Sequence, residues 1–480
     1  MTAAVSAFPA PFARAPVNKW VVTLSVTFGT LMGAIDTSIV AVATPHLTGA
    51  LGATVEEMTW VTTGFVIATV VVMPLTAFLG RFFGQKRVYL FSLGLFVLGS
   101  ALCGLARSLP MMVACRALQG LGAGAVPAVA YVSIGRSLAG PQRARMMAVL
   151  STAWVAPGVA GPALSAEVAH LFGWRWVFLG LLPVVVVTGS IAVPALVRLG
   201  PPGARRAVEH RLSDGILTAA GAALVLAGLT LAAGSRAVLT GAVLAGAGLV
   251  AAGAVAGLPA LRRLVPAGTL LARRGLPTTI LTRGLLTFAF FGADAYVTLS
   301  ITVVRHRSPV VAGIAVTGAT LAWTAGAWVQ ARLSESWEGR RLVRAGLVIV
   351  LAGIAGMVLM LQPGVPVAAG LAAWTVAGLG MGLAYAPISL LMLREAPPGR
   401  EGWASASLNL ADVLGTALGI GVGGAAVTAG SGAGRSLYAG VTVAFAVAAA
   451  MAVAAAALTR RLPAGPAGAP PPAVAERVPV

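Results

Sequence analysis

Apolar segments recur along the whole chain, and each is long enough to cross a lipid bilayer. A transmembrane helix needs about 20 predominantly apolar residues, and hydrophobic residues make up 58% of this 480-residue sequence. Charged residues account for only 10%, against about 25% in an ordinary soluble domain. We therefore predict an all-α polytopic membrane protein with fourteen transmembrane helices. The predicted spans are residues 20–44, 58–80, 88–106, 110–134, 146–169, 176–197, 213–234, 237–258, 276–304, 309–331, 342–361, 365–393, 403–430 and 437–458.

The placement of basic residues predicts the orientation of the chain. A formal net charge of +20 would suggest a nucleic-acid partner in a soluble protein, but here most lysines and arginines flank the spans on one side. With the N-terminus inside, that side is the cytoplasm under the positive-inside rule. We expect both termini to be cytoplasmic, in the cell (inner) membrane, and no nucleic-acid partner. The segment Arg305-His306-Arg307 falls outside and is the local exception.

The sequence lacks the motifs of several enzyme classes. Neither lysine, Lys19 or Lys86, stands in a G-x-x-x-x-G-K-[ST] loop for ATP hydrolysis, and H-E-x-x-H and G-x-S-x-G are absent. Cys103 and Cys115 lie within apolar spans without metal-like spacing, so we interpret them as buried small hydrophobes. We predict no enzymatic activity, no cofactor and no metal site. Uphill transport would then draw on an ion gradient or a separate ATPase.

Internal repetition predicts the domain organisation. The turns 79–87 and 332–341 both contain Gly and end in a basic pair, which favours two equivalent six-helix halves with their substrate path at the shared interface. The predicted division is a disordered tail 1–19, a first half 20–197, a loop with two inserted helices 198–258, a cytoplasmic loop 259–275, a second half 276–458 and a disordered tail 459–480.

Five short motifs resemble those of a known transporter family. The turn 79–87, the segment RALQGLGAG at 116–124 and the pair Gly161-Pro162 are similar to three motifs of the major facilitator superfamily, in the same order. The strings at 36–45 and 174–178 resemble its fourteen-span drug:proton antiporter branch. The resemblance implies two halves that alternate access to a central site, and proton-coupled export.

The motif residues allow two interpretations each. In the first turn, Gly84 permits a tight reversal, and the basic side chains either anchor the loop in the cytoplasm or take part in gating. In the fifth span, the Gly-Pro motif either marks an exporter or makes a plain packing kink. The motif and gating candidates are Arg81, Gly84, Lys86, Arg87, Gln119, Gly120, Gly158, Gly161 and Pro162.

Four ionisable residues inside predicted spans are the proton-coupling candidates. Asp36 is the one charged residue in 20–44, and a carboxylate at the centre of a span costs about 2.5–3.5 kcal/mol on insertion scales, so functional roles are common. A rise of about 1.5 Å per residue places Arg116 at a similar depth, either in a static ion pair or beside a carboxylate that exchanges a proton. Asp294 and Asp412 are further candidates, or hydrogen-bonded links between helices.

Polar and aromatic residues of the second half are candidates to line a cavity, with packing as the alternative. They are Tyr296, Trp323, Trp328, Gln330, Trp374, Tyr385 and Asn409.

With the family resemblance, these residues predict a proton-coupled secondary transporter that exports hydrophobic small molecules or drugs, cations among them. Its expected partners are a small-molecule substrate, protons and the lipid bilayer. The alternatives are proton-coupled transport of a specific metabolite and, with no motif in favour, a non-transporting receptor or an integral membrane enzyme.

Overall fold

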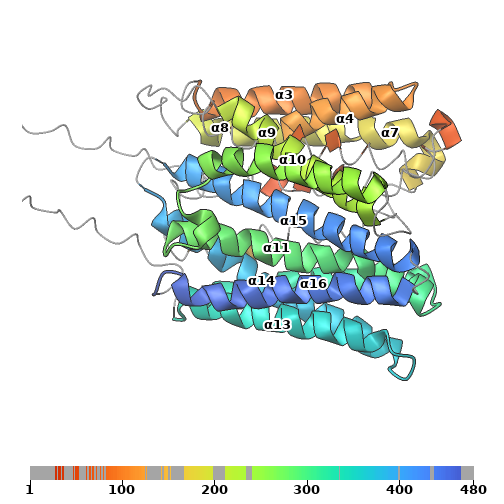
Figure 1. Ribbon diagram of the computed structural model, residues 1–480. Helices are drawn as coiled ribbons and strands as arrows, with labels where there is room; N and C mark the ends of the chain where they lie inside the picture. The colour runs from red at the N-terminus through yellow and green to blue at the C-terminus, as the bar shows by residue number, and fades with distance from the viewer. Residues whose placement is uncertain are drawn as a thin grey trace, which may run out of the picture.

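The computed structural model describes residues 83–124, 167–197, 211–233, 241–334, 336–397, 400–432 and 437–465, with scattered positions between 27 and 79 and between 126 and 152. Its elements in this part of the chain are helices that run side by side in a bundle (Figure 1). Nine of the helices in the described ranges are long and apolar enough to cross a membrane. The prediction of a helical membrane protein is therefore confirmed, while the count of fourteen spans stays a prediction.

The region before residue 200 contributes the helices α3 (Gln85–Gly104), α4 (Leu109–Ala123), α7 (Trp174–Leu179) and α8 (Leu181–Val197). Ser108 caps α4, because its hydroxyl accepts a hydrogen bond from the Met111 amide at 3.4 Å. The Ser100 hydroxyl of α3 donates to the Phe178 carbonyl at 2.8 Å and so links α3 to α7. The predicted span 176–197 consists of two consecutive helices, α7 and α8, which meet at Gly180.

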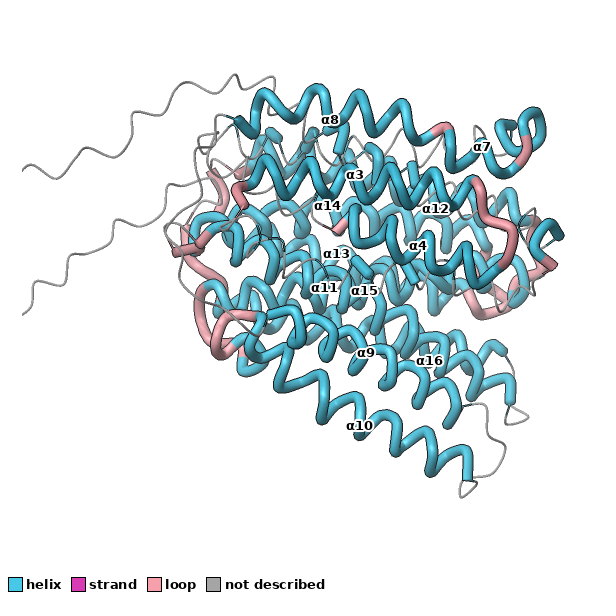
Figure 2. Tube along the Cα trace, turned by 90° about the horizontal axis from the view of Figure 1, so that it is seen from above, coloured by secondary structure: helices cyan, strands magenta, loops and turns pink. Residues whose placement is uncertain are grey.

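Two helices, α9 (Arg211–Ala233) and α10 (Gly241–Leu264), pack along each other at one edge of the bundle (Figure 2). Glycines let their backbones approach closely: a Cβ on Gly221 would lie 2.6 Å from the Gly253 carbonyl oxygen. Ala219 and Leu264 of this pair share an apolar cluster with Leu410 and Leu414. The pair therefore packs against the C-terminal helices, as an addition to their outer surface.

Most of the long apolar helices in the described ranges lie in the C-terminal region. Its most deeply buried helix is α14, with 83% of its most apolar stretch buried, against 17% for the peripheral helix α10. The elements are η1 (Thr269–Leu271), α11 (Leu276–Leu299), the π-helix η2 (Ser300–Val304), α12 (Pro309–Leu333), α13 (Gly339–Met360), α14 (Val367–Glu395), α15 (Glu401–Gly432), α16 (Leu437–Leu458) and η3 (Thr459–Arg461).

Most predicted span ends agree with the observed helix ends within a few residues, but α10 differs. The predicted span ends at 258 and a predicted loop begins at 259, because proline usually breaks a helix. In the structure α10 continues through Pro259 to Leu264. Proline lacks only one backbone donor, and a helix at the edge of a bundle tolerates the resulting gap when its neighbours adapt.

The loops gather at two ends of the C-terminal bundle. At one end Arg461 donates to the carbonyl oxygen of Ala272 at 3.1 Å, so the loop after α10 lies against the end of α16. At the other end Arg305 donates to the carbonyl oxygens of Gln362, Pro363 at 3.3 Å and Val365 at 2.9 Å. Arg305, the exception to the charge rule, therefore ties two loops together.

Candidate functional site

A buried polar cluster joins Asp36 to α4. The Nη1 atom of Arg116 donates to Asp36 Oδ1 at 2.9 Å and to Oδ2 at 3.0 Å. Gln119 lies one turn further along α4, on the same face, and its Nε2 donates to Asp36 Oδ1 at 2.9 Å. Arg116 is 2% exposed, and both Asp36 and Gln119 are 0% exposed. The predicted pairing of Asp36 with Arg116 is present, with both carboxylate oxygens fully engaged.

The glycine motif after Arg116 sets how closely α4 meets its neighbours. A Cβ on Gly120 would lie 2.3 Å from the Phe65 carbonyl oxygen, and one on Gly122 would lie 2.5 Å from the Phe96 amide nitrogen. Gly120 thus faces the second span, and Gly122 faces α3. Close approach of the backbones brings the Arg116 guanidinium within 4.3 Å of the Phe65 ring centre.

A second buried cluster surrounds Asp412 on α15. Its Oδ2 accepts a hydrogen bond from the Tyr385 hydroxyl at 2.7 Å, and its Oδ1 lies 3.8 Å from Arg283 Nε. Arg283 also donates to the Tyr385 carbonyl at 2.8 Å, and its guanidinium lies over the Tyr385 ring. The Asp412 side chain is 17% exposed, and its Oδ1 accepts no hydrogen bond from the residues that the structure describes. The Asp412 carboxylate therefore accepts fewer hydrogen bonds than the Asp36 carboxylate.

Close helix packing explains why Arg283 reaches Asp412. A Cβ on Gly415 of α15 would lie 2.1 Å from the carbonyl oxygen of Gly284 on α11. The Thr287 hydroxyl also donates to the Asp412 carbonyl at 3.1 Å. Glycine at these positions therefore brings the two backbones together beside the ion pair.

A continuous line of aromatic rings connects Asp412 to Asp294. Trp374 Nε1 donates to Asp294 Oδ1 at 2.9 Å, and the Trp374 ring stacks on Phe290 with centres 5.2 Å apart. Phe290 meets Trp323 edge-on at 5.6 Å, and Trp323 lies 5.3 Å from Tyr385, the partner of Asp412. The structure thus brings Trp323, Trp374 and Tyr385 together with two of the predicted carboxylates.

The other predicted cavity residues lie elsewhere. Trp328 donates from Nε1 to the Thr152 hydroxyl at 2.9 Å, so it contacts the fifth predicted span instead of the aromatic line. The amide of Gln330 is fully buried, and within the described ranges neither its nitrogen nor its oxygen has a hydrogen-bond partner. Asn409 donates to the Ser405 carbonyl of its own helix at 3.0 Å.

The two predicted turns differ in their backbone. Gly84 has φ 84°, a backbone conformation that is unfavourable for residues other than glycine. In the second turn Gly339 begins α13 without positive φ, and Glu338 pairs with Arg340 at 2.6 Å and Arg341 at 3.3 Å. The hydrogen bond from Arg340 lowers the pKa of Glu338 below its ordinary value. The turns 79–87 and 332–341 are therefore similar in amino-acid composition but differ in backbone geometry.

Several predicted motif residues cannot be compared with the structure. Arg81, Gly158, Gly161 and Pro162 lie outside the described residues, whereas Lys86 and Arg87 are exposed in the first turn of α3.

Arg283 is not among the predicted site residues, because it stands near the end of a span and resembles a topology anchor. Its position eight residues into α11, beyond the usual reach of an anchor, is the signal that indicates an internal role.

Comparisons with known proteins agree on one family. Residues 26–420 match the Major Facilitator Superfamily. The uncharacterized transporter YebQ of Escherichia coli K12 is 29% identical over 82% of this chain and 86% of its own length. Multidrug resistance protein 3 of Bacillus subtilis is 32% identical over 42% of this chain, and the match covers only 37% of that relative.

The fold agrees with the same family. The crystal structure of the human organic anion transporter MFSD10 superimposes with a TM-score of 0.65 over 94% of this chain and 100% of that chain, at 15% sequence identity. At that identity the likeness concerns the fold alone, and a fold of this kind hosts many substrates. The substrate must be argued from the side chains.

Proposed function

The chain belongs to the major facilitator superfamily of multi-pass membrane transporters, and we propose that it exports hydrophobic small molecules, cations among them, in exchange for protons. In this proposal two six-helix halves alternate access to a central site in the inner membrane. The chain has fourteen spans, and both termini lie in the cytoplasm.

The observation that carries the proposal is the incomplete pairing of Asp412. One oxygen accepts the Tyr385 hydroxyl at 2.7 Å, while Arg283 Nε stays 3.8 Å from the other, which accepts no hydrogen bond. Such a carboxylate gains or loses a proton without dismantling a complete hydrogen-bond network. Ionisable groups inside spans commonly act in proton relays.

The Asp36 cluster supports a different role. Arg116 and Gln119 together make three hydrogen bonds to the two Asp36 oxygens, so a proton on Asp36 would displace at least one of them. We assign Asp36, Arg116 and Gln119 to holding the first span against α4. Asp412 becomes the leading candidate for proton exchange, and Asp294 is the second.

The surroundings of Asp412 support a hydrophobic cation as substrate. The Tyr385 hydroxyl contacts it, and the Trp323 ring lies 5.3 Å from the Tyr385 ring. The faces of aromatic rings such as Trp323 attract cations. A bound cation favours the ionised carboxylate and so promotes proton release, while protonation weakens cation binding by the same amount. That reciprocity is the coupling an antiporter needs.

The relatives support export of drugs without deciding it. Multidrug resistance protein 3 shares the family, but in relatives at 32–34% identity the aligned part covers 28–37% of their length.

Everted membrane vesicles provide the test. Vesicles containing the protein are acidified inside by respiration, and a pH-sensitive acridine dye reports proton release when ethidium, a fluorescent hydrophobic cation, is added. We expect proton release with the unaltered protein and none with Asp412→Asn. Ethidium binding without proton or ethidium movement would indicate a receptor, and ethidium movement that ignores the proton gradient would contradict coupling.

A further inference from the structure

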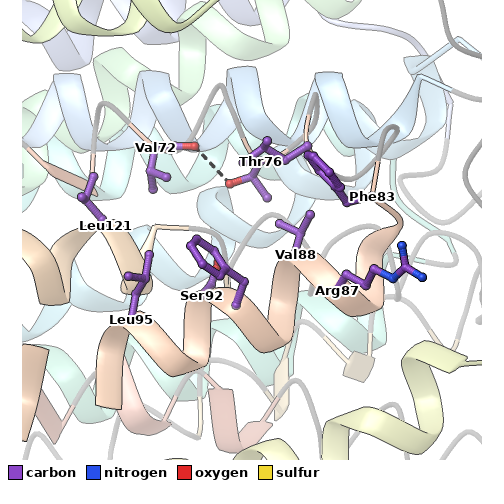
Figure 3. A pocket seen from close by; sticks show the side chains of 10 residues that line it. Val72, Thr76, Phe83, Arg87, Val88, Ser92, Leu95 and Leu121 are labelled. Atoms are coloured by element: carbon purple, nitrogen blue, oxygen red, sulfur yellow. Dashed lines mark hydrogen bonds between the residues drawn. The ribbon is translucent and has the colours of Figure 1, made fainter. Parts of the chain in front are cut away.

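A cavity of about 430 Å³ lies between α3, α4 and the second predicted span, and none of the residues that line it belongs to either carboxylate cluster. Its volume falls in the range of about 300–1,000 Å³ typical of pockets that hold small molecules. The walls are almost entirely apolar, with Val72, Val88, Leu95 and Leu121 among them (Figure 3). The Thr76 hydroxyl donates to the Val72 carbonyl at 3.1 Å, so this wall residue already has its partner.

The cavity adjoins the membrane-facing side of α3. Phe91, which lines it, is 66% exposed, and Leu98, two turns further along α3, is 50% exposed. Exposed apolar side chains on a transmembrane helix face hydrocarbon. Molecules with acyl chains therefore surround this part of the protein, and one such chain is the natural occupant of an apolar cavity there.

A positive charge stands at one end of the cavity. Arg87 lines the cavity and extends beside Phe83, at the end opposite Leu121 (Figure 3). Lys86 precedes it, and both are exposed in the first turn of α3, which has no acidic residue. Basic residues at a helix N-terminus are opposed by the helix dipole. Among the described residues neither has an ion-pair partner, so an external anion would balance them.

We propose that this cavity binds an anionic phospholipid. One acyl chain lies along the apolar wall between Thr76 and Leu95, and the phosphate of the headgroup pairs with Arg87 and Lys86. Basic pockets between transmembrane helices on the cytoplasmic side are known to suit anionic headgroups. Under the orientation proposed above, the lipid comes from the inner leaflet. Because the second span and α3 both line the cavity, the lipid bridges the two helices on either side of the turn 79–87.

The test is lipid retention by the purified full-length protein, measured by native mass spectrometry in a neutral detergent. Phosphatidylglycerol and phosphatidylcholine with identical acyl chains are compared at equal concentration. We expect selective retention of phosphatidylglycerol. Arg87→Gln should weaken it about fivefold, the ratio expected for one basic residue at an anionic lipid surface. Arg262→Gln, an exposed charge in the last turn of α10, is the matched control and should change nothing.

A second pair of variants tests the apolar part. Leu95→Trp fills the cavity and should reduce retention of phosphatidylglycerol, whereas Leu98→Trp places the same side chain on the exposed face of the same helix and should not. Circular dichroism and the unfolding temperature establish that each variant is folded. The charge variants and the cavity variants are independent tests, because the first concerns the headgroup and the second the acyl chain.

Several outcomes would overturn the proposal. Equal loss with Arg87→Gln and Arg262→Gln would mean general charge attraction. Equal retention of phosphatidylcholine would remove the role of the anion. Unchanged retention in Leu95→Trp would place the acyl chain elsewhere, and displacement of the lipid by millimolar inorganic phosphate alone would indicate a free-phosphate site.

Discussion

At the residue scale, the two buried acid–base pairs differ in how completely each carboxylate is satisfied. Asp36 accepts from Arg116 and Gln119 through both oxygens, whereas one oxygen of Asp412 accepts no hydrogen bond in the described part of the chain. A fully satisfied buried network mainly fixes structure, and a partly satisfied one is easier to change. The contrast supports our proposal of a structural role for the first carboxylate and proton exchange for the second.

The first prediction concerns Asp412→Asn. The amide keeps the size of the side chain but no longer titrates, so uphill export of ethidium should fall by at least tenfold while ethidium binding stays within a few-fold. Tyr385→Phe should have a smaller effect, since it removes one hydrogen bond to a charged group, worth about 1.5–3 kcal/mol. Export is measured in cells without their own efflux pumps, with and without a protonophore. Full protonophore-sensitive export by Asp412→Asn would transfer the role to Asp294 or Asp36.

The second prediction is a double-mutant cycle at Asp36 and Arg116. Breaking a buried pair by removing one partner costs about 3–5 kcal/mol, because the other charge stays buried. Asp36→Asn and Arg116→Gln should therefore each lower the unfolding temperature. The double variant should recover most of the loss and retain measurable proton-coupled export. A double variant that folds normally and exports nothing would show that Asp36 itself couples transport.

At the residue scale, contacts that depend only on the depth of a residue in the membrane could be predicted from the sequence. Counting residues along two spans was enough to bring Asp36 and Arg116 to the same level. The partners of Asp412 and Asp294 depend on how α11, α14 and α15 are rotated about their axes, which no count along the chain supplies. The aromatic line from Trp374 to Tyr385 and the role of Arg283 therefore emerged only from the structure.

At the element scale, glycines allow particular helices to pack closely against each other. The spacing at 120, 122 and 124 gives α4 two faces without side chains, one toward the second span and one toward α3. Helix ends could be predicted from charges and apolar length, because the thickness of a membrane sets the length of each apolar stretch and keeps charged residues outside it. The break at Gly180 and the passage of α10 through Pro259 could not, because neighbouring helices determine whether a weak position bends, breaks or continues.

The third prediction compares two glycine substitutions. Gly122→Ala puts a methyl group within 2.5 Å of the Phe96 amide nitrogen, so the helices must separate, at a cost of about 1–3 kcal/mol. Gly94→Ala on α3 meets nothing within 4 Å and should be neutral or slightly favourable, since alanine is the better helix former. Thermal unfolding in detergent measures both. Equal unfolding temperatures for the two variants would contradict the close α3–α4 contact.

At the scale of the whole molecule, the ends of α12 offer a matched test of orientation. Ser336 follows this helix and Ser308 precedes it, and both are exposed. After replacement of Cys103 and Cys115, we expect an impermeant thiol reagent added to intact cells to label Ser308→Cys and spare Ser336→Cys. Permeabilised cells provide the control, in which both label. The reverse pattern would invert the proposed topology.

The last prediction concerns the contact between the fifth predicted span and α12, which belong to different halves in our proposal. Ala148 packs against Ala327 and Ala331 of α12, and Trp328 donates to the Thr152 hydroxyl at 2.9 Å. Small side chains make this contact close but give it little apolar area, so it can separate at modest cost. A transporter that alternates access must open such a contact once in every cycle.

A crosslink between the halves should therefore stop transport. On the background without native cysteines, Ala148→Cys combined with Ala331→Cys should form a disulfide under mild oxidation and abolish ethidium export, and a reductant should restore it. Each single cysteine should export normally before and after oxidation, because it cannot bridge the halves. Complete crosslinking with undiminished export would mean that the fifth span and α12 stay together throughout the cycle, and the moving surfaces would have to be sought elsewhere in the bundle.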